Sequence, residues 1–571
     1  MRKILQLHLR RMLLVAMVAV GMTMPLVAQT FTANRLNYSI SNGEATIVSF
    51  VKGEKIDTLR IPDVIEYNNA SYPVVAIADK AFRSSSSTVA AYMGANIKTI
   101  GNEAFAMDSK LDTVYLNEGL LSIGNYAFQN SKLTFISLPA SLTHFGECVF
   151  YGNKTLVGLS LAAANTHFSY TNGILVNNTE HCIVLCPGQS PESVTIAPGM
   201  THICGSAFTG KTLQMLSLPS SLTTIGESAF ENCTALTTVQ GADNITSYGQ
   251  RAFSGCTKLA SLSFTSALKE IGAAAFANTG FTEINLPTSV TTIGNTAFMQ
   301  CKALKKANIP TANVKMGKGI YQSCSALTDI SMPDGLTVIP RDMFSNTALS
   351  TVAIPASVTW IDNGAFYMTK LKQVELPDGL RHLGQNVFYN TPLTSIVIPN
   401  HVDTIGQGCF NQCKKLRKAV IGTGTRVIAK SAFNSTALDS ISLPEGLVEI
   451  QQLGISVNPY LKSMVLPSTL TTLGARSLFR NSVTSVTAKM TTPPNIREDL
   501  TNKIFADYTD WQGDSIYTYC TLYVPKGSLE VYQSARGWKL FQTIKEDDAS
   551  VAGLDAEAER RLIGIPLKAY A

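Results

Sequence analysis

The chain has 571 residues, of which 45% are hydrophobic and 15% charged, and its formal net charge is +6. Four of those positive charges (Arg2, Lys3, Arg10 and Arg11) lie in the first 28 residues, which contain no acid, so the rest of the chain carries only +2. A chain this close to neutral offers no overall electrostatic basis for binding nucleic acid or an anionic membrane.

The first predicted element is an export signal at residues 1–28. Its basic start is followed by the apolar run MLLVAMVAVGMTM and by a small residue, Ala28, at the expected cleavage point, which is the order of a secretory signal peptide. The apolar run is too short to span a bilayer comfortably, and no later segment approaches the length of about 18 apolar residues that a span requires. We therefore predict an exported protein, secreted, at the cell surface or periplasmic, with no membrane span once the signal is removed.

Residues 29–78 are predicted to form an N-terminal cap. Within them, LNYSISNGEATIVSFVKG at 36–53 alternates apolar and polar residues, which is typical of a β-hairpin with one buried face. It directly precedes a long repeated segment, whose first unit would otherwise expose an apolar face to solvent.

The repeated segment covers residues 79–482 and has a unit of 22 or 23 residues. LPSSLTTIGESAFENCTAL at 218–236 returns as LPTSVTTIGNTAFMQCKAL at 286–304, and the Phe of the Ala-Phe pair recurs at about 17 positions between residues 82 and 479. Each unit contains a short alternating strand that ends at Pro and a second extended piece that ends at Gly. One unit cannot bury its apolar face but a stack can, so we predict a β-rich solenoid of stacked parallel short strands.

The turn after the repeated Phe occurs in a long and a short form, and one cysteine slot belongs to the long form. Stacked cysteines in this slot would have Cα atoms about 5 Å apart, within reach of a disulfide, but their in-register Cβ vectors run parallel. We expect small buried thiols, with disulfides as the alternative. The slot is occupied by Cys233, Cys256, Cys301, Cys324 and Cys413.

Two regions interrupt or end the repeat. The spacing between repeated Phe residues jumps to 58 from Phe150 to Phe208, and the runs flanking NNTEH within it indicate a hairpin inserted at about 151–207. Residues 483–546 break the period and are predicted to form an irregular C-terminal cap. Residues 547–571 form a tail to which the sequence assigns no role.

The unit L-x-x-I-x-L-P-x-x-L-T-x-I-G-x-x-A-F-x-x-C resembles the BspA-like bacterial leucine-rich repeat, over roughly residues 36–546. The opening YPVVAIADKAF and the closing LYVP segment with its later Tyr and Trp look like the flanks of that family. The resemblance implies a leucine-rich-repeat solenoid with short helical or 3-10 turns. It also implies a surface adhesion protein that binds host matrix proteins such as fibronectin and fibrinogen.

Catalytic motifs are absent from the sequence. No histidine pair has the H-x-x-x-H or H-E-x-x-H spacing of a zinc site, and no G-x-S-x-G motif is present. We therefore predict no catalytic, cofactor or metal-binding residue. The alternative of an enzyme would place its site in the insertion or the caps. Within the insertion, His167, His181 and Cys182 gather.

The candidate partner-binding residues are two basic patches on a solenoid whose outward strand positions are otherwise mostly Ser and Thr. The first patch is Lys302, Lys305 and Lys306, and the second is Lys414, Lys415, Arg417 and Lys418. Five units separate them, or about 24 Å at the usual spacing of strands. They are expected to dock an acidic partner, the alternative being solvated charge that keeps the sheet from self-association. With three Trp in the chain, aromatic stacking on sugars is a weaker basis for binding.

Taken together, the sequence predicts a non-enzymatic, exported binding scaffold that adheres to or captures a host or bacterial macromolecule through the exposed faces of the solenoid. The expected partner is an extracellular macromolecule, with host matrix proteins among the candidates, and neither a cofactor nor nucleic acid is expected. We expect a monomer. The alternative is a structural spacer of the periplasm or envelope.

Overall fold

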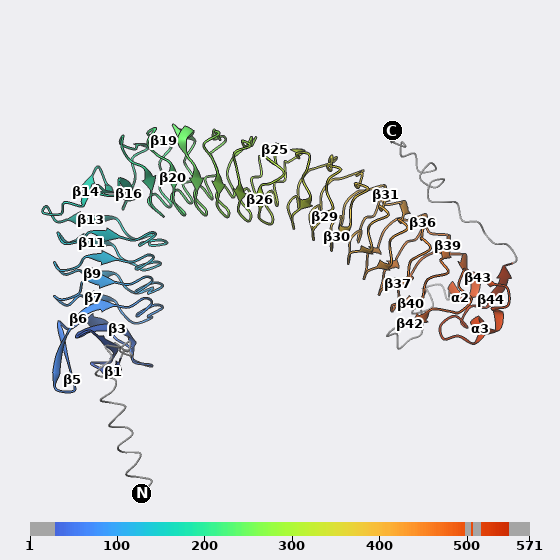
Figure 1. Cartoon of the computed structure of the whole chain (residues 1–571), viewed down its shortest axis with the longest axis horizontal. Coiled ribbons are helices and arrows are strands. Elements are labelled where there is room, and N and C mark those ends of the chain that lie inside the picture. The colour runs from blue at the N-terminus through green and yellow to red at the C-terminus, as the bar shows by residue number, and fades with distance from the viewer. Residues whose placement is uncertain (1–28, 497–503, 506–515, 548–571) are drawn as a thin grey trace, which may run out of the picture. The chain divides into compact units, whose positions relative to one another are not determined.

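The computed structural model of the chain describes residues 29–496, 504–505 and 516–547 (Figure 1). The predicted signal at 1–28, parts of the predicted C-terminal cap and nearly all of the predicted tail lie outside these described residues. The chain divides into two compact units, residues 1–189 (unit 1) and 190–571 (unit 2). Within the described part, no helix combines the length and the apolar character that crossing a bilayer requires.

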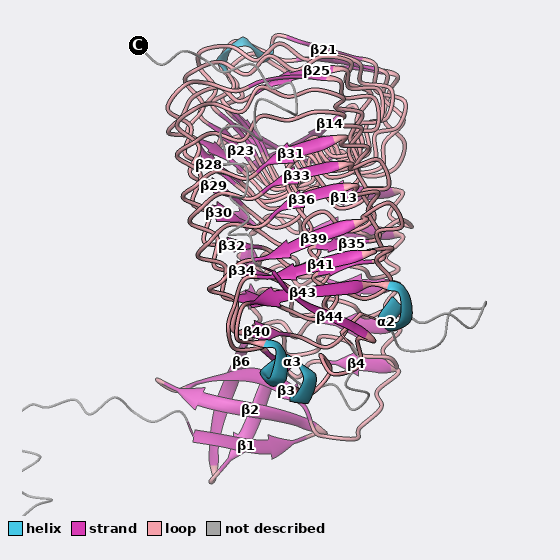
Figure 2. Ribbon diagram, turned by 90° about the vertical axis from the view of Figure 1, so that its right-hand side faces the viewer, coloured by secondary structure: helices cyan, strands magenta, loops and turns pink. Residues whose placement is uncertain are grey.

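Unit 1 begins with an antiparallel meander of β1 (Gln29–Ala33), β2 (Leu36–Ser41) and β3 (Glu44–Phe50). Asn42 and Gly43, at the turn between β2 and β3, both have positive φ, as a tight two-residue hairpin turn requires. The strand β3 then pairs in parallel with β6 (Ala70–Ile77). The strand β6 also pairs with β5 (Val64–Tyr67), and this pairing is antiparallel. Through β6 the meander joins the first parallel sheet of the solenoid, as Figure 2 shows.

Each turn of the solenoid can contribute two short strands, which belong to two faces. Face A holds the strands that precede the Pro of the repeat, and face B holds those that precede its Gly. In unit 1, face A comprises β4 (Thr58–Arg60), β7 (Ala90–Tyr92), β9 (Thr113–Tyr115), β11 (Phe135–Leu138) and β13 (Gly158–Leu161). Face B comprises β8 (Thr99–Ile100), β10 (Ser122–Ile123) and β12 (His144–Phe145). All of their pairings are parallel.

The segment after β13 contains three antiparallel strands, where a single hairpin was expected. They are β14 (Phe168–Thr171), β15 (Ile174–Asn177) and β16 (Cys182–Leu185). The additional reversal occurs at Asn172 and Gly173, which both have positive φ. The Asn177 side chain accepts hydrogen bonds from the backbone N–H groups of Thr179 and Glu180 and so closes the second turn.

Unit 2 repeats the two faces over a longer array, and Figure 2 shows them as two separate series of strands. Its face A strands are β17 (Ser193–Thr195), β19 (Met215–Ser217), β21 (Thr238–Gln240), β25 (Lys306–Asn308), β27 (Asp329–Ser331), β31 (Ser395–Val397), β33 (Lys418–Val420), β36 (Ser440–Ser442), β39 (Ser463–Leu466), β41 (Ser485–Ala488), β43 (Thr521–Pro525) and β44 (Thr543–Asp547).

The face B strands of unit 2 are β18 (His202–Ile203), β20 (Thr224–Ile225), β22 (Ser247–Tyr248), β23 (Glu270–Ile271), β24 (Thr292–Ile293), β26 (Lys315–Met316), β28 (Val338–Ile339), β29 (Trp360–Ile361), β30 (His382–Leu383), β32 (Thr404–Ile405), β34 (Val427–Ile428), β37 (Glu449–Ile450), β40 (Thr472–Leu473) and β42 (Asn495–Ile496). A short pair, β35 (Phe433–Asn434) and β38 (Ile455–Ser456), lies outside both faces.

The predicted solenoid of 22- and 23-residue units is confirmed. The register of β20, β22, β23 and β24 places the isoleucine or tyrosine of one turn directly beside that of the next. The predicted helical or 3-10 turns are mostly hydrogen-bonded turns that contain a residue of positive φ. Among the described residues, helix is confined to η1 (Ala242–Asn244), α2 (Ile516–Tyr519) and α3 (Leu529–Ser534).

The repeated Phe forms the centre of the core in unit 2. Phe208 and Phe230 stack with ring centroids 5.1 Å apart and an interplanar angle of 3°, and the stacking continues turn by turn to Phe433. Tyr321 takes one place in this column, and its hydroxyl donates to the carbonyl of Asn308 at 2.8 Å. The buried tyrosine therefore satisfies its polar atom, which makes the substitution compatible with an apolar core.

Most face B strands are followed by a Gly, at which consecutive turns approach closely. A Cβ atom on Gly294 would lie 2.4 Å from the backbone nitrogen of Ala273, and one on Gly249 would lie 2.6 Å from that of Glu227. At these turns no side chain fits without a shift of the backbone. Other turns of unit 2 are spaced so that the same slot holds a side chain: Cys204, Pro340, Asp362, Ala429 and Gln451.

The two turn lengths correspond to two ways of satisfying a buried carbonyl. In short turns a threonine hydroxyl donates to the carbonyl of the Phe three residues earlier, as Thr279 does to Phe276 at 3.0 Å. In long turns the cysteine thiol donates to the Phe carbonyl of the preceding turn, as Cys233 does to Phe208 at 3.0 Å. All eleven cysteines are buried, and the hydrogen bond from the thiol explains why the predicted cysteine slot is buried.

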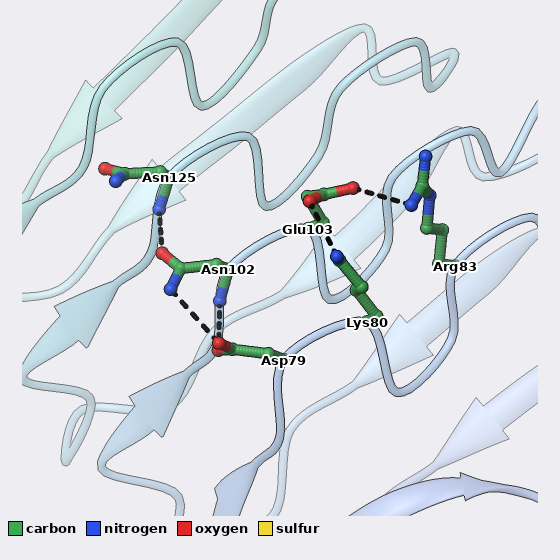
Figure 3. Close-up of polar contacts among 6 residues, drawn as sticks. All are labelled: Asp79, Lys80, Arg83, Asn102, Glu103 and Asn125. Carbon is green, nitrogen blue, oxygen red and sulfur yellow. Dashed lines mark hydrogen bonds and ion pairs between the residues drawn. The ribbon is translucent and has the colours of Figure 1, made fainter.

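In unit 1, side chains after the face B strands form a polar ladder between turns (Figure 3). A carboxylate oxygen of Asp79 accepts from the backbone N–H of Asn102 at 2.7 Å, and the side-chain oxygen of Asn102 accepts from the N–H of Asn125 at 2.8 Å. Each side chain thus satisfies a backbone donor that the turn leaves unpaired, which fixes the spacing of neighbouring turns.

Candidate binding face

The predicted partner-binding residues lie on face A of unit 2 or in the turns directly before its strands, and each turn presents two neighbouring outward positions. In the turn of the first patch, Leu304 and Ala307 are buried, while Lys305 and Lys306 between them are exposed. We call the residue directly after the buried leucine of each turn column 1, and the next residue column 2. The parallel register of β25 with β27, and of β33 with β31 and β36, carries each column from turn to turn. Where face A has no strand, as at Lys372, backbone hydrogen bonds to the neighbouring turns do the same.

The three lysines of the first patch are exposed, but they differ in their surroundings. Lys306, in column 2, lies in register between Glu283 and Asp329, and its Nζ is 3.9 Å from a carboxylate oxygen of Glu283. Two acids therefore offset its charge. Lys302 and Lys305 form no ion pair with any described residue, so their charges remain available to a partner.

The second patch is also largely exposed, with one cation engaged. Lys414 and Lys415 are exposed, whereas Lys418, at the start of β33, is partly buried. Arg417, in column 1, places its Nε 3.0 Å from a carboxylate oxygen of Asp439 and its guanidinium 4.7 Å from the ring centre of Tyr460. These contacts hold Arg417 in place while leaving it exposed.

The structure adds cations to the two predicted patches. Lys372 lies in column 1 between the two patches, because its N–H donates to the carbonyl of Ser350 and its own carbonyl accepts from Thr394. Lys462 follows a buried leucine in the same way and accepts from the N–H of Thr484. Aligning the units on their buried leucine would have revealed both residues. The column 1 cations are Lys305, Lys372, Arg417 and Lys462.

The residues beside these cations are short and bonded to the backbone. Three threonine hydroxyl groups each donate to the carbonyl of the cation one turn earlier, at 3.2–3.4 Å. The pairs are Thr328 with Lys305, Thr394 with Lys372, and Thr484 with Lys462. These threonines bind the backbone of the turn before them and do not reach across the face. The long cationic side chains are therefore the groups on this column that can extend to a partner.

Other cations of the chain show what a neutralised site looks like. In unit 1, Lys80 and Arg83 both pair with the carboxylate of Glu103 on the next turn, at 3.4 and 3.0 Å (Figure 3). Within the described residues, Lys305, Lys372 and Lys462 have no such ion pair. Column 1 of unit 2 thus contains four cations, of which Arg417 alone is matched by a neighbouring acid.

The repeat type can now be compared with known proteins. The BspA type leucine rich repeat region matches in six copies, over residues 57–166, 187–305, 291–417 and 381–509, which is more than half of the chain. The chain belongs to the BspA type leucine-rich repeat family. No curated protein sequence matches it.

Several solved structures resemble this BspA type repeat protein at low identity. A leucine rich cell surface protein from Faecalibacterium prausnitzii is 19% identical, covering 53% of this chain and 94% of its own, with a TM-score of 0.31. A leucine-rich repeat protein from Bacteroides ovatus is also 19% identical, covering 77% and 95%, with a TM-score of 0.32. One from Eubacterium ventriosum is 18% identical, covering 61% and 96%, with a TM-score of 0.42. The family assignment depends on the repeat match and not on these structures.

The residues named for an enzymatic alternative lie in unit 1, close together in sequence. His167 places its Nδ1 3.3 Å from the hydroxyl of Thr179, His181 lies in a turn with positive φ, and Cys182 is buried on β16. Burial and a neighbouring hydroxyl are ordinary structural surroundings for these groups. The enzymatic alternative stays a prediction that no contact described here supports.

Face B of unit 2 carries an aromatic pair that the sequence analysis did not single out. The rings of Trp360 and His382, on adjacent strands β29 and β30, stack in parallel. Burial lowers the pKa of His382, an effect that the charges of Asp362 and Asp403 oppose. Trp360 remains 43% exposed, so this pair is a second, smaller surface feature on the opposite set of strands.

Proposed function

We propose that this BspA type repeat protein is a non-enzymatic, exported binding scaffold that captures an acidic extracellular macromolecule through face A of unit 2. The observation that carries the proposal is the row of column 1 cations, which are exposed and each tied by a backbone hydrogen bond to a neighbouring turn. Solenoids of this kind bind through their extended regular faces, since these present many side chains at once.

The two predicted basic patches are part of this binding face. Lys302, Lys305, Lys414 and Lys415 are exposed and have no ion pair with a described residue, which leaves their charge for an acidic partner. Host matrix proteins are the partners that the resemblance to the family suggested. Export rests on the basic and apolar order of residues 1–28, and we extend to this chain the cell-surface location printed for the Faecalibacterium protein.

The proposal is tested by a pull-down from host matrix and cell-surface extracts with the purified chain as bait. The recovered partner is then measured by surface-immobilised binding, at two salt concentrations, for wild type and for the variant K302E/K305E/K306E. Affinity should fall as salt rises, because salt screens charges over about 8 Å at physiological ionic strength. The variant should slow association more than it speeds dissociation, since exposed charges act mainly on encounter.

The matched control is K315E, which reverses an exposed cation on face B of the same unit. Affinity that is independent of salt, or equal losses in the patch variant and in K315E, would contradict binding through face A. Failure to recover any partner would favour the structural spacer.

A further inference from the structure

The column 1 cations form a row along unit 2 whose spacing follows from the repeat. Lys305 and Lys372 are three turns apart, and Arg417 and Lys462 follow at intervals of two turns each. With neighbouring strands about 4.8 Å apart, the intervals are about 14, 10 and 10 Å and the row is about 34 Å long. A row of this length and of one residue's width suits a linear ligand.

On three turns the column 1 cation has a second exposed cation beside it. Lys302 precedes Lys305 by three residues, Lys370 precedes Lys372 by two, and Lys415 precedes Arg417 by two. A pair of cations projecting from one turn can bracket a single anionic group. The row is therefore three paired positive sites followed by one single cation, Lys462.

The other side of the row is lined by acids. Glu283 and Asp329 lie in column 2, Glu375 lies two residues further along its turn, and Asp439 interrupts column 1 itself. A broad acidic surface, such as that of a folded protein, would bring its own carboxylates against these four. A narrow polyanion can follow the lysines and leave the acids in solvent.

The chemistry of the row also distinguishes between kinds of linear polyanion. Proteins that hold single-stranded nucleic acid combine positive charge with exposed aromatic platforms for the bases. The exposed aromatic beside this row is Tyr460, and the guanidinium of Arg417 already covers its ring at 4.7 Å. Between the cations lie Thr328, Ser350 and Thr394, small hydroxyl residues that leave room for a sugar backbone.

We infer that face A of unit 2 binds a linear sulfated polysaccharide, laid along the row of Lys305, Lys372, Arg417 and Lys462 with its sulfate groups between the paired cations. This inference rests on the proposed function and names the class of its partner. Recognition is by charge and spacing, so it does not depend on aromatic stacking against sugar rings.

The test uses the purified chain and three probes: heparin, chemically desulfated heparin, and single-stranded DNA of matched charge. Three proteins are compared. They are the wild type, the row variant K305E/K372E/K462E, and the control K269E/K315E/R426E, which reverses three exposed cations beside or on face B and changes the net charge equally. Circular dichroism and the unfolding midpoint check that each variant is folded, and K305Q/K372Q/K462Q replaces the row variant if reversal disturbs folding.

Wild type should bind heparin, and should bind desulfated heparin and DNA far more weakly. The row variant should lose roughly 100-fold in affinity for heparin at physiological salt, while the control stays close to wild type. The slope of log affinity against log salt should decrease by about two in the row variant, since three fewer cations release counterions.

Equal affinity for heparin and DNA, or equal losses in the row variant and the control, would overturn the inference. If heparin does not bind but a protein partner does, with salt-dependent affinity that the first patch variant weakens, then the polysaccharide is wrong and the proposed function stands. If neither binds, both are wrong.

Discussion

Phe276 lies in the middle of the aromatic column of unit 2 and has no exposed surface. Its ring stacks between Phe253, at 5.7 Å with an interplanar angle of 5°, and Phe298, at 5.5 Å with 7°. Tyr248 and Phe264 approach it edge-on, at 4.9 and 5.4 Å. Phe281 also contacts it, at 5.5 Å in a tilted arrangement. The change Phe276→Ala therefore removes one member of a continuous stack and its contacts with five aromatic neighbours.

Truncating a buried Phe to Ala generally costs about 3–5 kcal/mol. We expect the upper part of that range here, because two stacked pairs are lost and the rigid turns on both sides cannot close the cavity. Phe276→Leu, which keeps most of the volume, should cost about 1 kcal/mol. Since each turn contacts only its neighbours, the loss should open the solenoid locally near this turn.

The control is Thr394→Ala on face A. Thr394 is exposed, and its hydroxyl makes one long hydrogen bond of 3.4 Å to the carbonyl of Lys372, so the expected change is within about 0.5 kcal/mol. The assay is guanidinium unfolding followed by circular dichroism, with limited proteolysis to locate the opened turn. Equal decreases in midpoint for Phe276→Ala and Thr394→Ala would refute the assignment of buried and exposed positions.

Three further predictions concern the backbone, a buried acid and the thiols. Gly294→Ala should destabilise unit 2 by about 1–3 kcal/mol, because its Cβ would clash with the preceding turn. The control is Gly379→Ala, whose Cβ would meet nothing nearer than 3.8 Å. This change should be neutral or slightly stabilising in the same unfolding assay. Burial raises the pKa of Asp108 to about 6 from 3.8. Between these two pH values the folded chain therefore holds a proton that the unfolded chain releases. The free energy of unfolding should rise as the pH falls through this window. Asp108→Asn should therefore stabilise the protein by about 2–3 kcal/mol near pH 8 and by little near pH 4, and equal effects at both pH values would contradict burial as the cause. Thiol titration should find most of the eleven cysteines free in denatured, unreduced protein and unreactive in the native state, and five disulfide bridges would disprove the ladder of buried thiols.

Much of the fold was predictable because the repeat states it many times. The Phe column and the fixed spacing of the strands follow from the period alone, since stacked units must bury the same residue at the same place. The difference between long and short turns was visible in the sequence, because the cysteine occurs only in the long form. The role of the cysteine was not visible, because the carbonyl that Cys233 satisfies belongs to Phe208, on another turn.

The candidate site was only half predictable for a similar reason. The two patches stand out in the sequence as clusters of neighbouring cations, whereas Lys372 and Lys462 are separated from them by dozens of residues. They join the row because turns of unequal length are brought into one register by backbone hydrogen bonds. The acids that neutralise Lys306 belong to the turns before and after it, and sequence proximity does not reveal them.

The interchangeable turns bear on how such a protein can evolve. The carbonyl of Phe276 accepts both from Thr279 of its own turn and from Cys301 of the next. Where two donors are present in this way, a one-residue insertion or deletion that removes one of them leaves that oxygen with the other. Unequal recombination between gene segments that encode whole units can then add or remove turns without leaving a defect at the junction. Copy number becomes a heritable variable, and the length of the binding face can change in steps of one strand spacing while each remaining turn keeps its sequence.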